Sequence, residues 1–288
     1  MSDPDPRSEP PDADRLTGDD AGRGATPRRY GLADLQIHTS AGDGMMDALA
    51  VLDYVEHRTD LDIVAVTDHD DIGGALAARE IHARGRYSFE LMTGVELTTR
   101  AGHLLALDID APLRPLRPLD ETMREIHRLG GLAVVPHPLS YLTRSIGERA
   151  LRRLLATHDP ELRPDGIELA NGSLAARVTE RKARRLNRES FRLPETGGSD
   201  AHFLPEVGRA ATLFAGSSIA DLRAALAAGE TEARLLAPVP LSLIGWRALA
   251  RQQVRGLSVT PRRVLGPALA RAGRRLRGIT APAGGGTP

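Results

Sequence analysis

Between residues 30 and about 230, short apolar runs alternate with longer amphipathic stretches, and this alternation restricts the fold more than any other feature of the chain. The apolar runs have the length of buried strands, and the stretches between them have helical spacing. We predict strands over residues 32–37, 63–67, 91–95, 103–107, 133–135, 166–169 and 211–214. We predict helices over residues 46–57, 73–83, 119–129, 146–156, 173–187 and 219–228. Such alternation is typical of an α/β fold with a parallel sheet and crossover helices, and about seven repeats favour closure into a barrel.

The chain divides into three segments by composition. Residues 1–29 contain almost no apolar side chains, so nothing offsets the entropy cost of ordering them, and we predict that they are disordered. Residues 30–236 form the α/β domain. Residues 237–288 are an Arg-rich C-terminal extension with nine arginines and no acidic residue, and its Gly- and Pro-rich end, residues 281–288, is also predicted to be disordered.

The C-terminal extension begins with an apolar patch made of Leu241, Ile244, Trp246 and Leu249. We expect the extension to be dispensable for catalysis and to supply an association surface. Either the apolar patch packs on the α/β domain while the arginines face solvent, or the arginines bind an anionic membrane surface or nucleic acid, an attraction that salt would screen.

Composition bounds the environment of the protein. The 38 basic and 38 acidic residues give a formal net charge of zero, which gives no reason at the level of the whole chain to expect nucleic acid as a partner. Cysteine is absent, which excludes disulfides and Cys-zinc sites. No apolar run reaches the roughly 18 residues of a membrane span, and the N-terminus lacks the basic-then-apolar pattern of a secretory signal. We therefore expect a cytoplasmic protein.

Histidines and carboxylates gather where the predicted strands end. The first strand leads into a Gly-rich loop that contains a histidine and, five residues later, an aspartate. Because the carboxyl ends of parallel strands meet on one face, such side chains are expected to share one site, and imidazole with carboxylate suits a divalent metal. Read alone, residues 68–70 or 200–202 would also fit a helix cap. The converging residues are His38, Asp43, His69, Glu96, His103, His137, Asp200 and His202.

Six short motifs follow one another along the α/β domain. They read Asp34-Leu35-Gln36-Ile37-His38-Thr39 followed by Asp43-Gly44, Thr67-Asp68-His69-Asp70, Gly94-Val95-Glu96, His103-Leu104-Leu105-Ala106, His137-Pro138 and Ser199-Asp200-Ala201-His202. In this order they resemble the PHP (polymerase and histidinol phosphatase) superfamily, in particular its single-domain metal-dependent phosphoesterases. The resemblance covers residues 32 to about 230.

The resemblance implies a distorted (β/α)7 barrel with a metal site at the carboxyl ends of its strands, holding two or three divalent ions (Mn, Zn or Fe). Glu96 would bridge two ions. Where the superfamily has its first histidine, this chain has Gln36. An amide oxygen is a poorer zinc ligand than imidazole and suits Mn²⁺ or Mg²⁺ better, so that metal position is weaker, takes a harder ion or is empty. The metal ligands carried over are Gln36, His38, Asp43, His69, Glu96, His103, His137, Asp200 and His202.

The activity implied is that of a metal-dependent phosphoric ester hydrolase, acting on a small phosphorylated substrate for which a nucleotide is one candidate. Metal-bound hydroxide would be the nucleophile. On loops of the same face, Arg144, Asn171 and Arg209 are candidates for binding the substrate, since arginine matches phosphate with two parallel hydrogen bonds. The residues expected to be catalytic are His38, Asp43, His69, Glu96, Asp200 and His202.

Two other functions are open on the sequence. A non-catalytic metal-binding PHP-like domain with a structural or regulatory role, as in PHP domains attached to polymerases, is favoured by Gln36. A barrel hydrolase acting on amide bonds would usually need a metal-bridging lysine or an extra acidic base. The only lysine, Lys182, falls in an Arg-rich helical stretch, which counts against the second function.

Overall fold

The computed structural model describes residues 30–236, 241–259 and 261, so the predicted disorder of residues 1–29 and 281–288 lies outside the described residues. The strands are β1 (Tyr30–Ile37), β2 (Ile63–Val66), β3 (Glu90–Thr98), β4 (His103–Leu107), β5 (Leu132–Val135), β6 (Gly166–Asn171), β7 (Glu195–Gly198), β8 (Ala210–Ala215) and β9 (Glu232–Leu235). The helices are α1 (Ala48–Arg58), α2 (Gly73–Arg84), α3 (Leu119–Arg128), α4 (Glu148–Leu155), α5 (Leu174–Leu186), α6 (Ile219–Ala228) and α7 (Leu241–Ile244), with short turns η1 (Pro160–Leu162), η2 (Asn187–Phe191) and η3 (Leu204–Glu206). Residues 246–259 are also helical.

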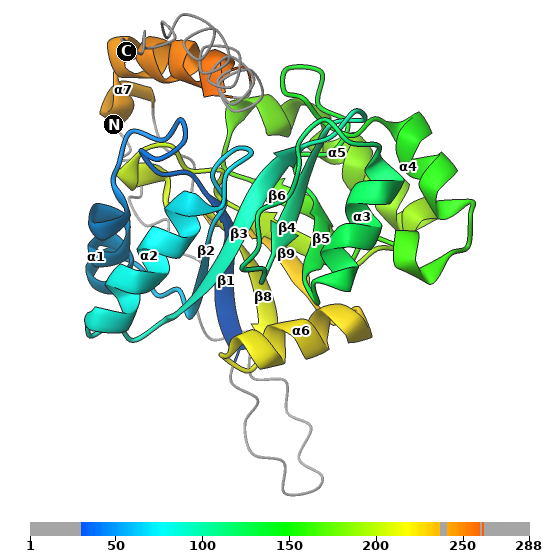
Figure 1. Ribbon diagram of the computed structural model, residues 1–288, viewed down its shortest axis with the longest axis horizontal. Coiled ribbons are helices and arrows are strands. Elements are labelled where there is room, and N and C mark those ends of the chain that lie inside the picture. Colours follow the sequence, from blue (N-terminus) through cyan, green and yellow to red (C-terminus); the bar gives the residue numbers. More distant parts are fainter. Residues whose placement is uncertain (1–29, 237–240, 260, 262–288) are drawn as a thin grey trace, which may run out of the picture.

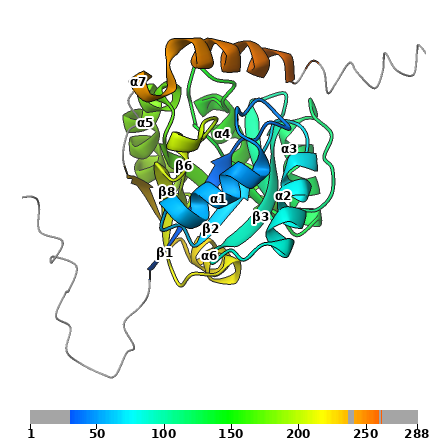
Figure 2. The same ribbon diagram turned by 90° about the vertical axis from the view of Figure 1, so that its left-hand side faces the viewer.

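The nine strands form one sheet in the order β7-β6-β5-β4-β3-β2-β1-β8-β9. This sheet curls until β7 meets β1 and β8. Ile37 forms a parallel bridge with Ala201, and the Gly197 amide donates to the Thr212 hydroxyl at 2.9 Å. The result is a nearly closed barrel with helices around it, as Figures 1 and 2 show. The α/β barrel predicted from the sequence is confirmed.

The prediction of an all-parallel sheet is wrong for β4 and β8. β4 is antiparallel to both β3 and β5, and β8 is antiparallel to β1. Only four residues, Thr99 to Gly102, connect β3 to β4, and a parallel crossover needs about a dozen or more. The chain therefore turns back as a hairpin. For this reason His103, the first residue of β4, lies at the edge where β3 ends.

β7 and β9 were not predicted as strands. β7 is Glu-Thr-Gly-Gly and carries no large apolar side chain, so it has no strand signature. Its glycines allow the barrel to close, because a Cβ on Gly197 would lie 2.4 Å from the carbonyl oxygen of Ala211. Strands are predicted from sequence by their apolar side chains. β7 instead needs small residues, because its backbone lies close to that of β8.

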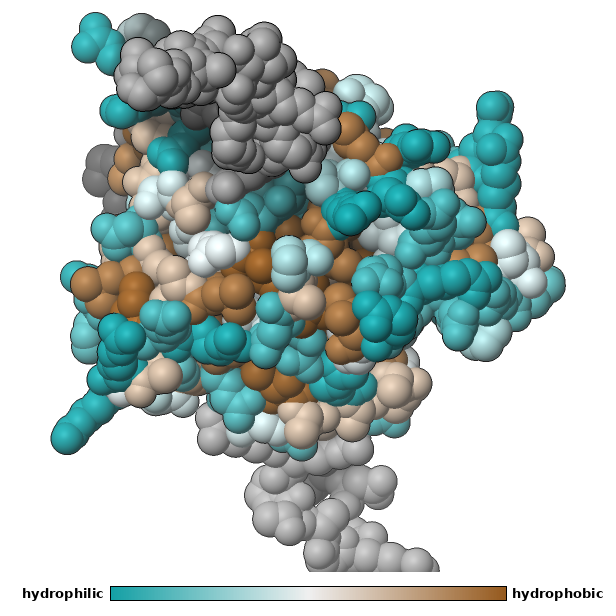
Figure 3. All heavy atoms as spheres, viewed as in Figure 1, coloured by the Kyte–Doolittle hydropathy of each residue, from teal (hydrophilic) through white to brown (hydrophobic). Residues whose placement is uncertain are grey.

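The core fills the interior of the barrel, and α6 packs against it at the amino end. Inward-facing residues alternate along the strands, as in Ala33 and Leu35 of β1 or Leu105 and Leu107 of β4. Leu222 of α6 belongs to the same cluster, so α6 packs against the interior core at the amino end. Other helices cover the outside with one apolar stripe each, and Figure 3 shows polar side chains over much of their solvent face. Among the described residues, no helix is long and apolar enough to cross a membrane.

Candidate metal centre

The eight ligand-type residues predicted from the sequence lie together at the carboxyl end of the barrel. Seven of them form three overlapping groups, within each of which one ligand atom per residue lies within 4.8 Å of the others. The eighth, His137, reaches the cluster through its Nε2, which is 3.0 Å from Glu96 Oε1. The groups are His38 with Asp43, His69 and His202; His69 with Glu96 and His103; and His38 with Glu96 and Asp200.

Glu96 is the centre of the cluster. Its Oε1 is 2.7 Å from His103 Nδ1, and its Oε2 is 3.1 Å from His38 Nε2. The side chain is 1% exposed. Burial alone favours the neutral acid, but the surrounding imidazoles, those of His69 and His103 foremost, hold the pKa of Glu96 well below its ordinary value. A carboxylate with ligand-type groups on both oxygens has the arrangement needed to bridge two ions.

Several polar atoms of the cluster are buried without a hydrogen bond. The approaches of His38 Nε2 to Glu96 (3.1 Å) and Asp200 (3.2 Å) lack hydrogen-bond geometry. Buried polar atoms are nearly always hydrogen-bonded, so a group of ring nitrogens and carboxylate oxygens without hydrogen bonds fits a bound cation. The unpartnered atoms here are Gln36 Oε1, both ring nitrogens of His38, Asp43 Oδ1, His69 Nδ1 and His103 Nδ1.

Gln36 lies inside this cluster, fully buried. Its Nε2 donates to Glu96 Oε2 at 2.8 Å, while its Oε1 has no hydrogen-bond partner. The side chain thus donates to the central carboxylate with one group and keeps an amide oxygen without a hydrogen bond. The structure places Gln36 beside the ligand-type residues, and its role as a ligand stays a prediction.

Three further carboxylates hold the loops that carry these ligands, and sequence reasoning did not single them out. Asp34 accepts from the Ser199 amide (2.8 Å), Asp68 from the Thr39 amide (2.6 Å), and Glu168 from the His137 amide (2.6 Å). Burial raises the pKa of Asp34 to about 6 and that of Glu168 to about 8. A carboxylate at a buried position of an apolar strand was the available signal for Asp34 and Glu168.

Two of the ligand-type residues occupy a strained backbone conformation. Asp200 has φ 54° and His137 has φ 28°, both in the left-handed region that L-residues rarely adopt. Such conformations cost on the order of 1–3 kcal/mol and persist where the surroundings enforce them, frequently at functional sites. The hydrogen bonds from Ser199 to Asp34 and from His137 to Glu168 supply that enforcement.

A cavity of about 430 Å³ opens over the cluster. Arg144 and Arg209 line it, as predicted for substrate-binding residues. Asn171 does not line it, because its amide donates to Glu168 and accepts from the Ser173 amide. Arg177 of α5 does line it, and its Nε is buried without a hydrogen-bond partner among the described residues. Sequence reasoning missed Arg177, which lies one turn into an arginine-rich helix and has no local signature.

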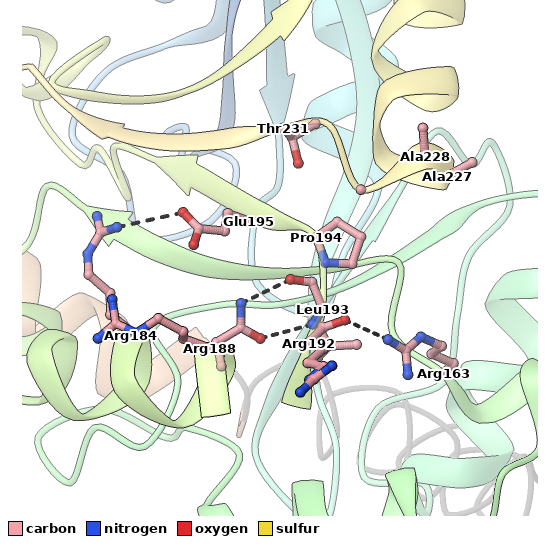
Figure 4. A pocket seen from close by; sticks show the side chains of 12 residues that line it. Arg163, Arg184, Arg188, Arg192, Leu193, Pro194, Glu195, Ala227, Ala228 and Thr231 are labelled. Atoms are coloured by element: carbon pink, nitrogen blue, oxygen red, sulfur yellow. Dashed lines mark hydrogen bonds and ion pairs between the residues drawn. The ribbon is translucent and has the colours of Figure 1, made fainter. Parts of the chain in front are cut away.

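A second, larger hollow of about 670 Å³ lies at the amino end of the barrel (Figure 4). Four arginines line it, but Arg184 pairs with Glu195 at 3.7 Å and Arg163 donates to the Arg192 carbonyl at 2.6 Å. Glu195 begins β7, and Asp200 follows the end of that strand, so the two hollows lie at opposite ends of β7.

Comparison with known proteins agrees with this geometry. A family model described as PHP-associated matches residues 180–231. The uncharacterized protein MJ1587 of Methanocaldococcus jannaschii is 31% identical over 153 residues, which are 48% of this chain and 81% of that protein. The chain belongs to the PHP superfamily. The resemblance inferred from the six motifs is thereby confirmed.

Two further proteins are similar to this chain. The 5'-3' exoribonuclease Rnm of Salmonella typhimurium is 29% identical over 185 residues, and the chain spans half of that protein's length. A two-domain protein of Bacteroides vulgatus, containing a predicted PHP-like metal-dependent phosphoesterase, superposes with a TM-score of 0.58 at 19% identity. That match covers 79% of this chain and 70% of the other, and it concerns the fold.

Proposed function

We propose that this PHP protein is a metal-dependent phosphoric ester hydrolase that acts on a small phosphorylated substrate, with a nucleotide as one candidate. The observation that carries the proposal is the set of buried, unpartnered lone pairs at the floor of an arginine-lined cavity. Two or three ions would be held there, with Mn, Zn and Fe as the candidates. The proposed ligands are Gln36, His38, Asp43, His69, Glu96, His103, His137, Asp200 and His202.

When bound, divalent ions would supply Lewis-acid stabilisation of phosphate oxygens and a water of lowered pKa. The protein's own groups prepare that chemistry. Burial, the main cause, lowers the pKa of His69 to about 4, so this imidazole is neutral at pH 7 and offers a lone pair. Neighbouring imidazoles, His202 foremost, overcome the effect of burial and hold Asp43 ionised.

Arginine side chains of the cavity wall would bind the substrate phosphate. Arg177 is the strongest candidate, because its Nε is buried without a hydrogen-bond partner in the described chain. Arg209 has its Nε already engaged with the Pro205 carbonyl at 2.8 Å, which fixes its stem and leaves the terminal nitrogens to bind phosphate. Together with Arg144 these residues give the cavity positive charge directly above the acidic floor.

The test is a screen of metal-replete protein against an aryl phosphate, nucleotides, sugar phosphates and a 5'-phosphorylated oligoribonucleotide. The oligoribonucleotide is included because the relative Rnm is an exoribonuclease. We expect turnover of at least one small ester, and loss of turnover when Asp200 and His202 are replaced by alanine. Protein that binds ions but turns over no ester with Mn²⁺, Zn²⁺ or Fe²⁺ would instead be the non-catalytic metal-binding domain that Gln36 suggested.

A further inference from the structure

The helical residues 246–259 lie across the carboxyl end of the barrel, orange in Figures 1 and 2, and touch the loop that follows β1. Gln252 is 6% exposed and its Nε2 donates to Asp43 Oδ2 at 3.3 Å. Arg255 donates from its Nε to the Gly42 carbonyl at 2.9 Å and from a terminal nitrogen to the Ser40 carbonyl. The helix is thus attached to a proposed metal ligand and to the backbone beside it.

A glycine allows this close approach. Gly256 lies one turn after Gln252 on the same face of the helix, and a Cβ built on it would be 3.0 Å from Asp43 Oδ2. Glycine inside a helix is normally unfavourable compared with alanine. At this position the missing side chain lets the helix lie close to Asp43.

The same helix forms part of the wall of the 430 Å³ cavity that Arg144 and Arg177 also line. A cavity of this volume is within the usual range for small-molecule sites. The residues that 246–259 contributes to the wall are Leu249, Gln252, Gln253, Gly256 and Leu257.

These contacts also bear on the association surface expected for this segment. Arg255 is engaged with two carbonyls, and the Arg247 guanidinium stacks over the Trp246 ring at 5.3 Å. Of the arginines in residues 246–259, only Arg251 is exposed without such a contact in the described structure. Of these described arginines, only Arg255 is held against the barrel in this way, whereas Arg247 and Arg251 are exposed, so the association surface stays a prediction.

We infer that helix 246–259 is a specificity-determining wall of the active site. It admits small phosphomonoesters and the terminal nucleotide of a strand, and it excludes the internal phosphodiesters of nucleic acid, which could reach the metal centre only if the helix moved away. The inference rests on the proposed function for its substrate class, while the docking of the helix on the loop of residues 40–43 stands independently of it.

The test uses the full chain with Gln252→Ala and Arg255→Ala combined, and Arg251→Ala as the matched control. The substrates are an aryl phosphate and a circular single-stranded oligonucleotide, which offers only internal phosphodiesters. In the double variant we expect the ratio of kcat/KM for the circle to that for the aryl phosphate to rise about tenfold. Arg251→Ala should leave the ratio unchanged. An unchanged ratio in the double variant, with the helix shown to be released, overturns the inference.

Hydrogen exchange of the amides of residues 246–259 gives a readout that needs no turnover. Exchange should be faster in the double variant, and inorganic phosphate should slow it in the wild-type protein. Gly256→Ala changes the exchange rate in opposite directions for a docked and an undocked helix. If the helix packs on Asp43, the added Cβ should make exchange faster. In an undocked helix, alanine would stabilise the helix and make exchange slower. If no ester is turned over, the proposed function fails. Slower exchange of these amides in the presence of inorganic phosphate would then still support the helix as a wall of the site, and unchanged exchange would overturn the inference.

Discussion

The two ends of the barrel carry hollows of opposite character. The larger, about 670 Å³, lies at the amino end, and its arginines are mostly exposed or paired with carbonyls and Glu195. The smaller, about 430 Å³, lies at the carboxyl end over buried histidines and carboxylates. An exposed arginine keeps its water and needs no ligand, whereas buried lone pairs without hydrogen bonds are costly until something binds them. Buried polar atoms without hydrogen bonds, and not the volume of the hollow, therefore mark the end that is suited to bind a ligand.

The largest expected effect comes from removing proposed metal ligands at the carboxyl end. We expect Asp200→Ala with His202→Ala to lower metal affinity roughly a hundredfold or more, since replacement of mere supporting groups already costs 10–100-fold. Elemental analysis and calorimetric titration after metal-replete purification would measure it. Arg188→Ala, at the amino end, is the control and should change nothing. Wild-type protein holding under one ion per chain would refute the assignment of a metal cluster.

A second substitution compares one arginine from each hollow. Arg177→Ala removes from the carboxyl end a half-buried arginine whose Nε has no hydrogen-bond partner among the described residues, and Arg188→Ala removes an exposed arginine from the amino end. Hydrogen bonds to charged groups are worth about 1.5–3 kcal/mol, so Arg177→Ala should raise KM for a phosphate ester about 10–100-fold, with a smaller change in kcat. Steady-state kinetics on both variants decides the point. Equal effects would mean that Arg177 does not bind the phosphate.

Gln36, at the carboxyl end, tests which metal the cluster prefers. Because its free Oε1 is an amide oxygen, we expect the wild-type protein to prefer Mn²⁺ over Zn²⁺. Gln36→His should raise zinc affinity about tenfold, as imidazole is the better zinc ligand. Competitive metal titrations of both proteins would show it. If metal preference and kinetics stay the same, position 36 is not a ligand.

His127 provides a contrast with the unsatisfied imidazoles and the smallest expected effect. Both its nitrogens have partners, the Glu161 carbonyl at 2.8 Å and Asp165 at 3.0 Å, and the bond to Asp165 raises the pKa of His127. A raised pKa means that the folded state binds the proton more tightly than the unfolded chain does. The stabilisation is therefore full below about pH 6.5 and is lost as the pH rises through the raised value.

We accordingly expect His127→Gln to lower the free energy of unfolding more at about pH 5.5 than at about pH 8.5. Urea unfolding of both proteins at the two pH values, in the presence of a chelator, measures the difference. A loss of the same size at both values would show that protonation of His127 contributes nothing.

Much of the fold and the meeting of most ligand-type residues could be predicted from the sequence. The ligand-type residues each follow or precede a recognisable strand, so their convergence follows from the convergence of strand ends. His103 was placed with these residues as well, although the first residue of a parallel strand would lie at the opposite edge of the sheet. It reaches the site because β4 turns back as a hairpin from β3, and that direction was not predicted.

Other parts of the site depend on contacts between distant residues. β7 has no apolar pattern because its glycines serve backbone approach. Arg177 looks like any arginine of an arginine-rich helix until the cavity is seen. The docking of Gln252 on Asp43 joins residues 209 positions apart and has no local sequence signal.

The closure of the barrel has a consequence for the order of events during folding. The Ser199 amide bonds to Asp34 across 165 residues, and Ile37 bridges Ala201, so Asp200 reaches His38 only when the first and seventh strands have met. Contacts so distant in sequence form late and slowly. A growing chain therefore carries most of its histidines long before it has a site for them. Ions that bind only the finished barrel would then favour the closed state by mass action, and metal supply would influence the yield of folded protein as well as its chemistry.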